Sequence, residues 1–227
     1  MRRFQISFLL LLGIITFEVS AGVVIGGSRM VYEGNKKEQS ITVENLDPTP
    51  FLIQSWIEDA SGKLLNSPPQ FFVTPPLFRL DGGQKNILRI INSMKSLPQD
   101  KESLFWLNIK SIPAKSDEDK NSLQIAVRSR LKLIYRPDSL LSEVPEEFSA
   151  KLVWHRQGNE LTVTNPSKYY MNFMSVKINN VKISDGGFVG PESAMTFTLP
   201  ANNLTGDLSW AIINDYGGTG PAHHFTL

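Results

Sequence analysis

The segment formed by residues 123–135 alternates apolar and polar side chains almost without interruption. A period of two is the signature of a β-strand with one apolar face. At ~3.3 Å per residue this segment would extend ~40 Å, well beyond the usual strand of about five or six residues. Several of its polar positions are basic, so a basic stripe runs beside the apolar one. The pattern is compatible with a long core strand, and equally with a strand whose edge is offered to another molecule.

The first 21 residues resemble an export signal. Arg2 and Arg3 give a positive start, and residues 8–17 form an apolar run. Small residues then lead to Ala21, which predicts cleavage after Ala21 and a mature chain that begins at Gly22. The competing interpretation, a single membrane anchor, needs an apolar run of about 20 residues, and this run is interrupted by Glu18. We therefore expect an exported, soluble mature protein.

Charge and cysteine content exclude several function classes. Removal of 21 residues from the 227 leaves 206, with 21 basic and 21 acidic side chains, because Arg2, Arg3 and Glu18 leave with the signal. A net charge near zero argues against bulk binding to nucleic acid or to anionic membranes. The chain has no cysteine. Disulfide staples, thiolate chemistry, cysteine zinc sites and iron–sulfur clusters are therefore excluded.

The remaining sequence reads as short strands separated by turn residues, with no helix of three turns. One set of strands precedes residue 138, and a second set begins near Phe148. The segment between them has the composition of a linker. This spacing predicts an all-β protein of two β-sandwiches. The expected organisation is a signal at 1–21, an N-terminal domain at 22–138 and a C-terminal domain at 143–227.

The sequence contains no recognised constellation for catalysis or metal binding. G-x-S-x-G, H-E-x-x-H and Walker motifs are absent. The three histidines are His155, His223 and His224. The adjacent pair would point to opposite sides of a strand, which suits edge or surface residues better than ligands of one metal. We expect no enzymatic activity and no cofactor.

Three basic residues lie in apolar surroundings. Arg29 opens the first strand pattern, Lys132 lies inside the long strand, and Arg136 precedes the domain junction. Each one alone is compatible with a solvated strand face. Arg29 and Lys132 near a cleft between the domains would hold an anion, since a guanidinium fork and an ammonium together suit a carboxylate.

Blocks along the whole mature chain resemble the periplasmic pilus chaperones of the chaperone–usher pathway, the PapD-like family. The blocks are residues 97–106, Ile112-Pro113, residues 123–137 and residues 213–218, together with Pro75-Pro76 and residues 78–80. They occur in the order found in the family. As a set they are specific, whereas any one alone would be weak.

The resemblance implies two immunoglobulin-like domains in an L-shaped (boomerang) arrangement. It implies that Arg29 and Lys132 bind the C-terminal carboxylate of a pilus subunit. Leu123, Ile125 and Val127 would enter the open groove of that subunit as a donor strand. It further implies a structural inter-domain salt bridge of three residues, Glu102, Arg136 and Asp215.

The implied partners are pilus (fimbrial) subunits and an outer-membrane usher, to which the folded and capped subunits would be delivered. No nucleic acid and no small-molecule substrate is expected, and self-association of the free protein through its exposed edge stays open. Two rival interpretations are an exported pilus subunit or adhesin, and a secreted β-sandwich hydrolase or carbohydrate-binding module. The first would carry its donor strand at the N-terminus, and the second needs paired carboxylates or an aromatic platform.

Overall fold

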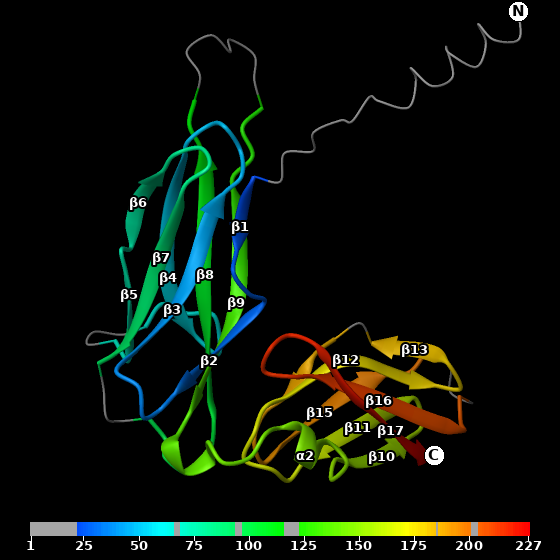
Figure 1. The fold of residues 1–227 in the computed structure, drawn as a ribbon. Helices are drawn as coiled ribbons and strands as arrows, with labels where there is room; N and C mark the ends of the chain where they lie inside the picture. Colours follow the sequence, from blue (N-terminus) through cyan, green and yellow to red (C-terminus); the bar gives the residue numbers. More distant parts are fainter. Residues whose placement is uncertain (1–21, 66–68, 94–96, 116–122, 185, 201–203) are drawn as a thin grey trace, which may run out of the picture.

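The computed structural model describes residues 22–65, 69–93, 97–115, 123–184, 186–200 and 204–227. The predicted signal, residues 1–21, lies outside them. The described chain forms two β-domains set at an angle to each other, so the molecule has the shape of an L (Figure 1). Within the described residues, no helix has the length and apolar character needed to cross a bilayer.

The N-terminal domain consists of two packed sheets. The strands of the first sheet, in spatial order, are β1 (Val23–Ile25), β3 (Glu38–Asn45), β7 (Lys85–Asn92) and β5 (Phe71–Thr74). Those of the second are β2 (Arg29–Glu33), β9 (Val127–Arg136), β8 (Ser103–Pro113), β4 (Phe51–Asp59) and β6 (Leu77–Leu80). Every pair is antiparallel except β2 with β9, which is parallel.

The C-terminal domain is a second sandwich. One sheet has the order β10 (Val153–Gln157), β11 (Glu160–Asn165) and β15 (Ser193–Thr198). The other has the order β13 (Val181–Ser184), β12 (Met171–Ile178), β16 (Asp207–Ile213) and β17 (Thr219–Thr226), and β14 (Phe188–Val189) also pairs with β12. A 3₁₀ turn, η1 (Asp138–Leu140), and a short helix, α2 (Glu146–Ser149), connect the two domains. The predicted all-β, two-sandwich architecture is confirmed.

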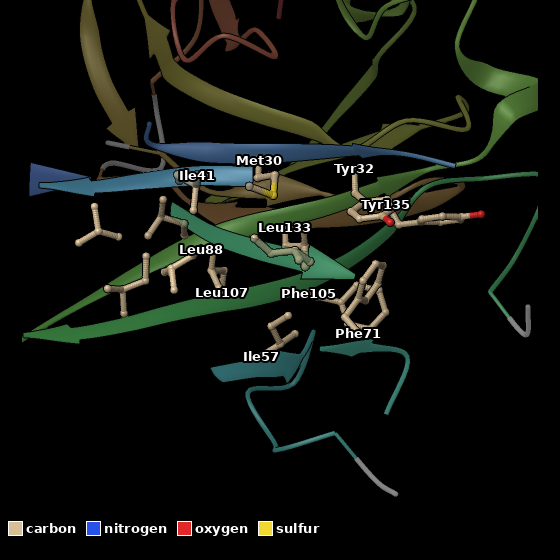
Figure 2. Packing of buried hydrophobic residues seen from close by; sticks show 14 of the residues in the cluster. Met30, Tyr32, Ile41, Ile57, Phe71, Leu88, Phe105, Leu107, Leu133 and Tyr135 are labelled. Carbon is tan, nitrogen blue, oxygen red and sulfur yellow. The ribbon is translucent and has the colours of Figure 1, made fainter. Parts of the chain in front are cut away.

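Alternation along the strands explains the N-terminal core. On β9, Leu131, Leu133 and Tyr135 point inward and join a cluster of buried side chains from both sheets (Figure 2). Aromatic rings close one end of this cluster, where the Phe71 ring lies 5.1 Å from that of Tyr32, centroid to centroid. Burial of each large apolar side chain contributes about 1.5–3 kcal/mol. Without cysteines, this packing and its counterpart in the second domain stabilise the fold.

The long strand is shorter than predicted. β9 begins at Val127, and residues 123–126 lie in no strand. The reason is the length of the neighbouring strand, β8, which pairs with β9 only up to the Ser111–Val127 pair. β8 ends at Pro113, whose ring nitrogen has no hydrogen to donate to a neighbouring strand. Residues 123–126 therefore have no neighbouring strand to pair with in the described chain, although their alternation is that of a strand.

The start of the second set of strands was also predicted wrongly. The region of Phe148 forms α2 instead, and the first strand of the domain begins at Val153. Pro145 precedes the helix, and Glu146 and Glu147 occupy its first turn, where acidic side chains interact favourably with the helix dipole. The predicted hairpin around Asn179 and Asn180 is confirmed, and both residues have positive φ angles, 46° and 67°.

Candidate functional site

The parallel pairing of β2 with β9 places two predicted site residues side by side. Arg29 is in register with Lys132, where β2 begins. Both side chains are half-buried at the junction of the two domains. Arg29 Nη1 donates a hydrogen bond of 3.4 Å to the carbonyl of Ile213 in the second domain. Arg29 and Lys132, which the sequence predicted to lie near each other, are thus neighbours. The carbonyl of Ile213 brings the second domain into contact with them.

Lys132 also reaches the second domain. Its Nζ atom donates a hydrogen bond of 2.6 Å to Asn172 Oδ1 and lies 4.6 Å from the centroid of the Phe188 ring. Sequence reasoning missed both residues. Asn172 sits between the buried residues Met171 and Phe173 and is itself buried. A buried amide within an apolar strand was the available signal for it, whereas nothing in the sequence around Phe188 set it apart.

The positive charges of Arg29 and Lys132 are not neutralised by carboxylates of the described chain. Within the described residues, neither Arg29 nor Lys132 forms an ion pair with a carboxylate, and the buried Nε atom of Arg29 has no hydrogen-bond partner. Burial, followed by the charge of Arg29, lowers the pKa of Lys132 to about 8. Burial likewise lowers the pKa of Arg29, against the opposing effect of Asp215. An anion placed here would relieve both effects, because it would favour the charged forms.

A second charged cluster lies four residues further along β9, at Arg136. Arg136 Nε donates to Glu102 Oε1 at 2.7 Å, and its two terminal nitrogens donate to the Asp215 carboxylate at 2.6 and 2.9 Å. The Glu102 side chain is fully buried, and its second oxygen accepts a bond of 2.6 Å from the Tyr170 amide. These three residues join β9, the segment before β8 and the β16–β17 connection, so they link the two domains.

Opposing effects act on the charges of this cluster. Burial lowers the pKa of Arg136, but its bonds to Asp215 and the charge of Glu102 raise it above the ordinary value. Burial raises the pKa of Glu102 to about 7, although Arg136 and the Tyr170 amide favour its ionised form. Each of the three guanidinium nitrogens of Arg136 donates to a carboxylate of the cluster, so its charge is neutralised within the chain.

The predicted donor residues lie at the opposite end of β9. The exposed fraction is 86% for Leu123, 66% for Ile125 and 55% for Val127, unusually high for large apolar side chains. Only Val127 belongs to the strand. β8 pairs with β9 from Val127 to Tyr135, whereas β2 covers the other edge only from Lys132 onward. In the described chain, the backbone of residues 127–131 therefore has one unpaired edge, which ends at the two cations.

The other polar candidates have structural surroundings. His223 Nε2 lies 2.6 Å from the hydroxyl of the buried Ser149, and His224 Nδ1 lies 3.0 Å from the Asp207 carboxylate. His223 and His224 lie on β17, the last strand of its sheet. No group of three or more metal-ligating side chains occurs among the described residues.

A basic pair at a domain junction, an open strand edge and exposed apolar residues beside it are features suited to binding another β-protein by strand addition. Family comparison agrees. Residues 22–141 match the model of the PapD N-terminal domain, the pili and flagellar-assembly chaperone, and residues 147–224 match the pili assembly chaperone PapD C-terminal domain. The chain therefore belongs to the PapD-like family of periplasmic pilus-assembly chaperones.

Relatives and solved structures agree with this assignment. The chain is 42% identical over 205 residues to the chaperone protein LpfB of Salmonella typhimurium, which covers 88% of this chain and 87% of the relative. Among solved structures, a chain from the Salmonella enterica SafA pilin–SafB chaperone complex superposes with a TM-score of 0.82 at 31% identity, covering 93% of this chain and 99% of that one. The periplasmic chaperone SfaE gives a TM-score of 0.78 at 37% identity, with 91% and 100% covered.

Proposed function

We propose that this chain binds, folds and caps pilus subunits by donor-strand complementation. The subunit's C-terminal carboxylate would lie between Arg29 and Lys132, and its open groove would take Leu123, Ile125 and Val127. The single observation that carries the proposal is the basic pair without a carboxylate partner, placed where the open edge of β9 ends. The SafA–SafB complex supports it, since a chaperone of this fold is joined there to a pilin.

The proposed anchor also implies a direction for the bound strand. An added strand on the open edge of residues 127–131 would be collinear with β2 and would stop where β2 begins, at Arg29. For the carboxylate to reach Arg29 and Lys132, the strand's C-terminus must point the same way as that of β9. The subunit strand would therefore run parallel to β9, as β2 does, rather than antiparallel to it.

The magnitudes are adequate for capture. Three apolar side chains, each contributing about 1.5–3 kcal/mol on burial, supply several kcal/mol. Hydrogen bonds to the charged carboxylate contribute about 1.5–3 kcal/mol each. The carboxylate fixes where the subunit strand ends, and the alternation decides which side chains enter the groove. A slip of one residue would turn Gln124 and Ala126 inward instead.

The proposal also includes the export of the chain, the delivery of its subunit and the absence of an enzymatic step. The first 21 residues direct export and are cleaved after Ala21, so the chaperone works in the periplasm. The chaperone delivers its subunit to an outer-membrane usher for pilus assembly. The proposed role consists of binding, capping and delivery, and it includes no enzymatic reaction.

The anchor is tested with Arg29→Ala and Lys132→Ala, each co-expressed with candidate pilus subunits and isolated from the periplasm by an affinity tag. We expect the subunit to co-purify with the unaltered chain and to be lost from both variants. Arg89→Ala, which removes an exposed cation from β7 in the other sheet, is the matched control and should retain the subunit. Normal recovery of the subunit with both anchor variants would refute the carboxylate anchor.

Strand donation is tested separately with Ile125→Glu. A charge in the apolar groove of the subunit would remain without a partner, at a cost of several kcal/mol. We expect no complex with this variant, whereas Gln124→Glu, whose side chain alternates to the other face, should form it. An unchanged yield of complex with Ile125→Glu would show that the subunit is held in some other way.

A further inference from the structure

The outward face of the second sheet carries a row of cations that extends beyond the proposed anchor. Cross-strand register places Lys110 of β8 opposite Arg128 of β9, and Trp106 opposite Lys132. Arg130 lies between them on β9 and faces the same way, because alternate residues of a strand share a face. Together with Arg29 beside Lys132, these residues form what we call the cationic strip: Arg29, Lys110, Arg128, Arg130 and Lys132.

The strip concentrates positive charge in a chain that carries a formal net charge of only +1. Among the described outward-facing residues of β4, β8 and β9 beside it, one carboxylate is present, that of Glu58. Five cations and one carboxylate leave an excess of four positive charges on one face. Like charges so close together repel one another, so the arrangement is costly unless an anionic partner covers it.

The two arginines are held in place rather than extended into solvent. Arg128 Nη2 donates to both Glu58 oxygens at 2.8 and 2.9 Å, and Arg130 Nη2 lies 3.4 Å from the same carboxylate. Each guanidinium also lies over an indole ring, Arg128 at 5.0 Å from the centroid of Trp56 and Arg130 at 4.1 Å from that of Trp106. Stacked and paired arginines lose little further freedom when they bind an anion.

These arginines nevertheless remain accessible. The exposed fraction of the side chain is 45% for Arg128 and 40% for Arg130. Glu58 engages one terminal nitrogen of each, and Asn108 Oδ1 accepts from Nε and Nη2 of Arg128 at 3.0 and 2.7 Å, so the Nη1 group of each guanidinium stays available for a second carboxylate. Both indole N–H groups are satisfied internally, by Glu58 Oε1 and by the Ala60 carbonyl, so the tryptophans serve as platforms for the cations.

The strip is continuous with the proposed anchor and lies on the side of the second domain. Lys132 and Arg29 belong to both, and the Trp106 ring lies 6.3 Å from that of Phe188 in the second domain. A subunit whose terminal strand lies along residues 127–131 must have the rest of its fold next to this face or beside it. The strip therefore borders the open edge of residues 127–131, along which the subunit strand would lie.

We propose that the cationic strip is a second contact surface for the pilus subunit, and that it takes an acidic patch on the subunit's body outside the strand groove. This inference rests on the proposed function, because it assigns a further contact to the same partner. The strip would steer acidic subunits toward the anchor and would select against basic ones.

The test uses the double variant Lys110→Gln/Arg130→Gln, in which Glu58 keeps its bonds to Arg128 and Trp56. The probe is a subunit purified from its complex with this chain in urea and then diluted into chaperone. Association rates are measured by stopped-flow fluorescence at ionic strengths of about 0.02 M and about 0.5 M. We expect the variant to associate about three- to tenfold more slowly at low salt and at the unaltered rate at high salt.

Lys85→Gln/Arg89→Gln on β7 removes the same charge from the other sheet and should leave the association rate within about twofold of the unaltered chain. An unchanged rate for the strip variant at low salt, or an equal reduction in the control, would overturn the proposal. Weaker binding of a DNA duplex with no change in subunit association would overturn it as well.

If the double variant does not fold, Lys110→Glu replaces it, since Lys110 forms no ion pair with the described residues. The same slowing at low salt is expected from it. The outcomes also separate this proposal from the preceding one. Failure of the unaltered chain to capture any subunit contradicts the chaperone function itself, whereas capture that is insensitive to the strip contradicts only the second contact.

Discussion

Arg136 and Lys132 lie four residues apart on the same face of one strand, at the same domain junction, yet their surroundings differ. Arg136 faces two carboxylates, Glu102 and Asp215, at hydrogen-bonding distance. Lys132 faces the neutral amide of Asn172 and a second cation, Arg29. One cation is neutralised within the chain and the other is left charged. Their difference separates a group that links the two domains from one that, in the proposed function, binds the carboxylate of a subunit.

The first cluster also determines the geometry of the second. By joining Glu102 to Asp215, Arg136 fixes the second domain against β9, and this places Asn172 against Lys132 and the Ile213 carbonyl against Arg29. A buried network whose charged groups are hydrogen-bonded to one another is rigid, whereas its disruption leaves charges that water cannot reach. The anchor is therefore preorganised by charges that do not touch the ligand.

The largest effect is expected from Arg136→Met. This change leaves Glu102 buried without its cation, and removal of one partner from a buried ion pair costs about 3–5 kcal/mol. Urea unfolding followed by near-ultraviolet circular dichroism should show that loss in the free energy of unfolding. A loss below about 1 kcal/mol, the range of exposed pairs, would break the comparison by showing that the two clusters contribute alike.

An intermediate effect is expected from pH on subunit capture. The pKa of Lys132 in the free protein is about 8, so its charge is lost as the pH rises above 8. If the carboxylate binds the charged form, affinity should fall by up to about tenfold per pH unit above that value. The measurement is the dissociation constant of the complex between about pH 7 and pH 9.5. Lys132→Arg, whose charge persists over this range, should flatten the profile, and an equal slope in both proteins would refute the role of this proton.

The smallest effect is expected from Lys132→Met on the free protein. Lys132 has a lowered pKa, so the unfolded state binds more protons between about pH 8 and pH 10.5, and the penalty of its charge is fully present below pH 8. Removal of the ammonium should thus leave the free energy of unfolding at pH 7 within about 1 kcal/mol of the unaltered value, or raise it. A loss comparable to that of Arg136→Met would make Lys132 a structural residue.

Much of the fold followed from local pattern. Alternation predicted the strands of both sandwiches, and Asn179-Asn180 predicted a hairpin because asparagine tolerates positive φ. Besides the helix α2 near Phe148, two features of strand pairing did not follow. After β1 has paired with β3, the chain crosses at Gly26-Gly27 to the other sheet, where β2 pairs with β9, and β9 starts at Val127 because β8 ends at Pro113. Both depend on which strands become neighbours, and that is a property of the tertiary structure.

The site was predictable to the extent that its residues stand out in the sequence. Arg29, Lys132 and Arg136 did so as cations in apolar surroundings, and the family resemblance supplied Glu102 and Asp215. Asn172 and Phe188 did not, since their proximity to Lys132 arises from the angle between the domains. The contribution of Glu58 to the cationic strip was equally hidden, because cross-strand register decides which strand residues share a row.

The pairing of β2 with β9 only from Lys132 onward has a kinetic consequence. Residues 127–131 are already held in extended conformation by β8, with one edge unpaired. The backbone that a partner strand would pair with is therefore already ordered before binding. Only the formation of hydrogen bonds along this edge remains. Residues 123–126, which form no strand in the free protein, would then order last and in sequence. In the proposed function, residues 127–131 thus act as a preformed template on which a strand of the subunit adds.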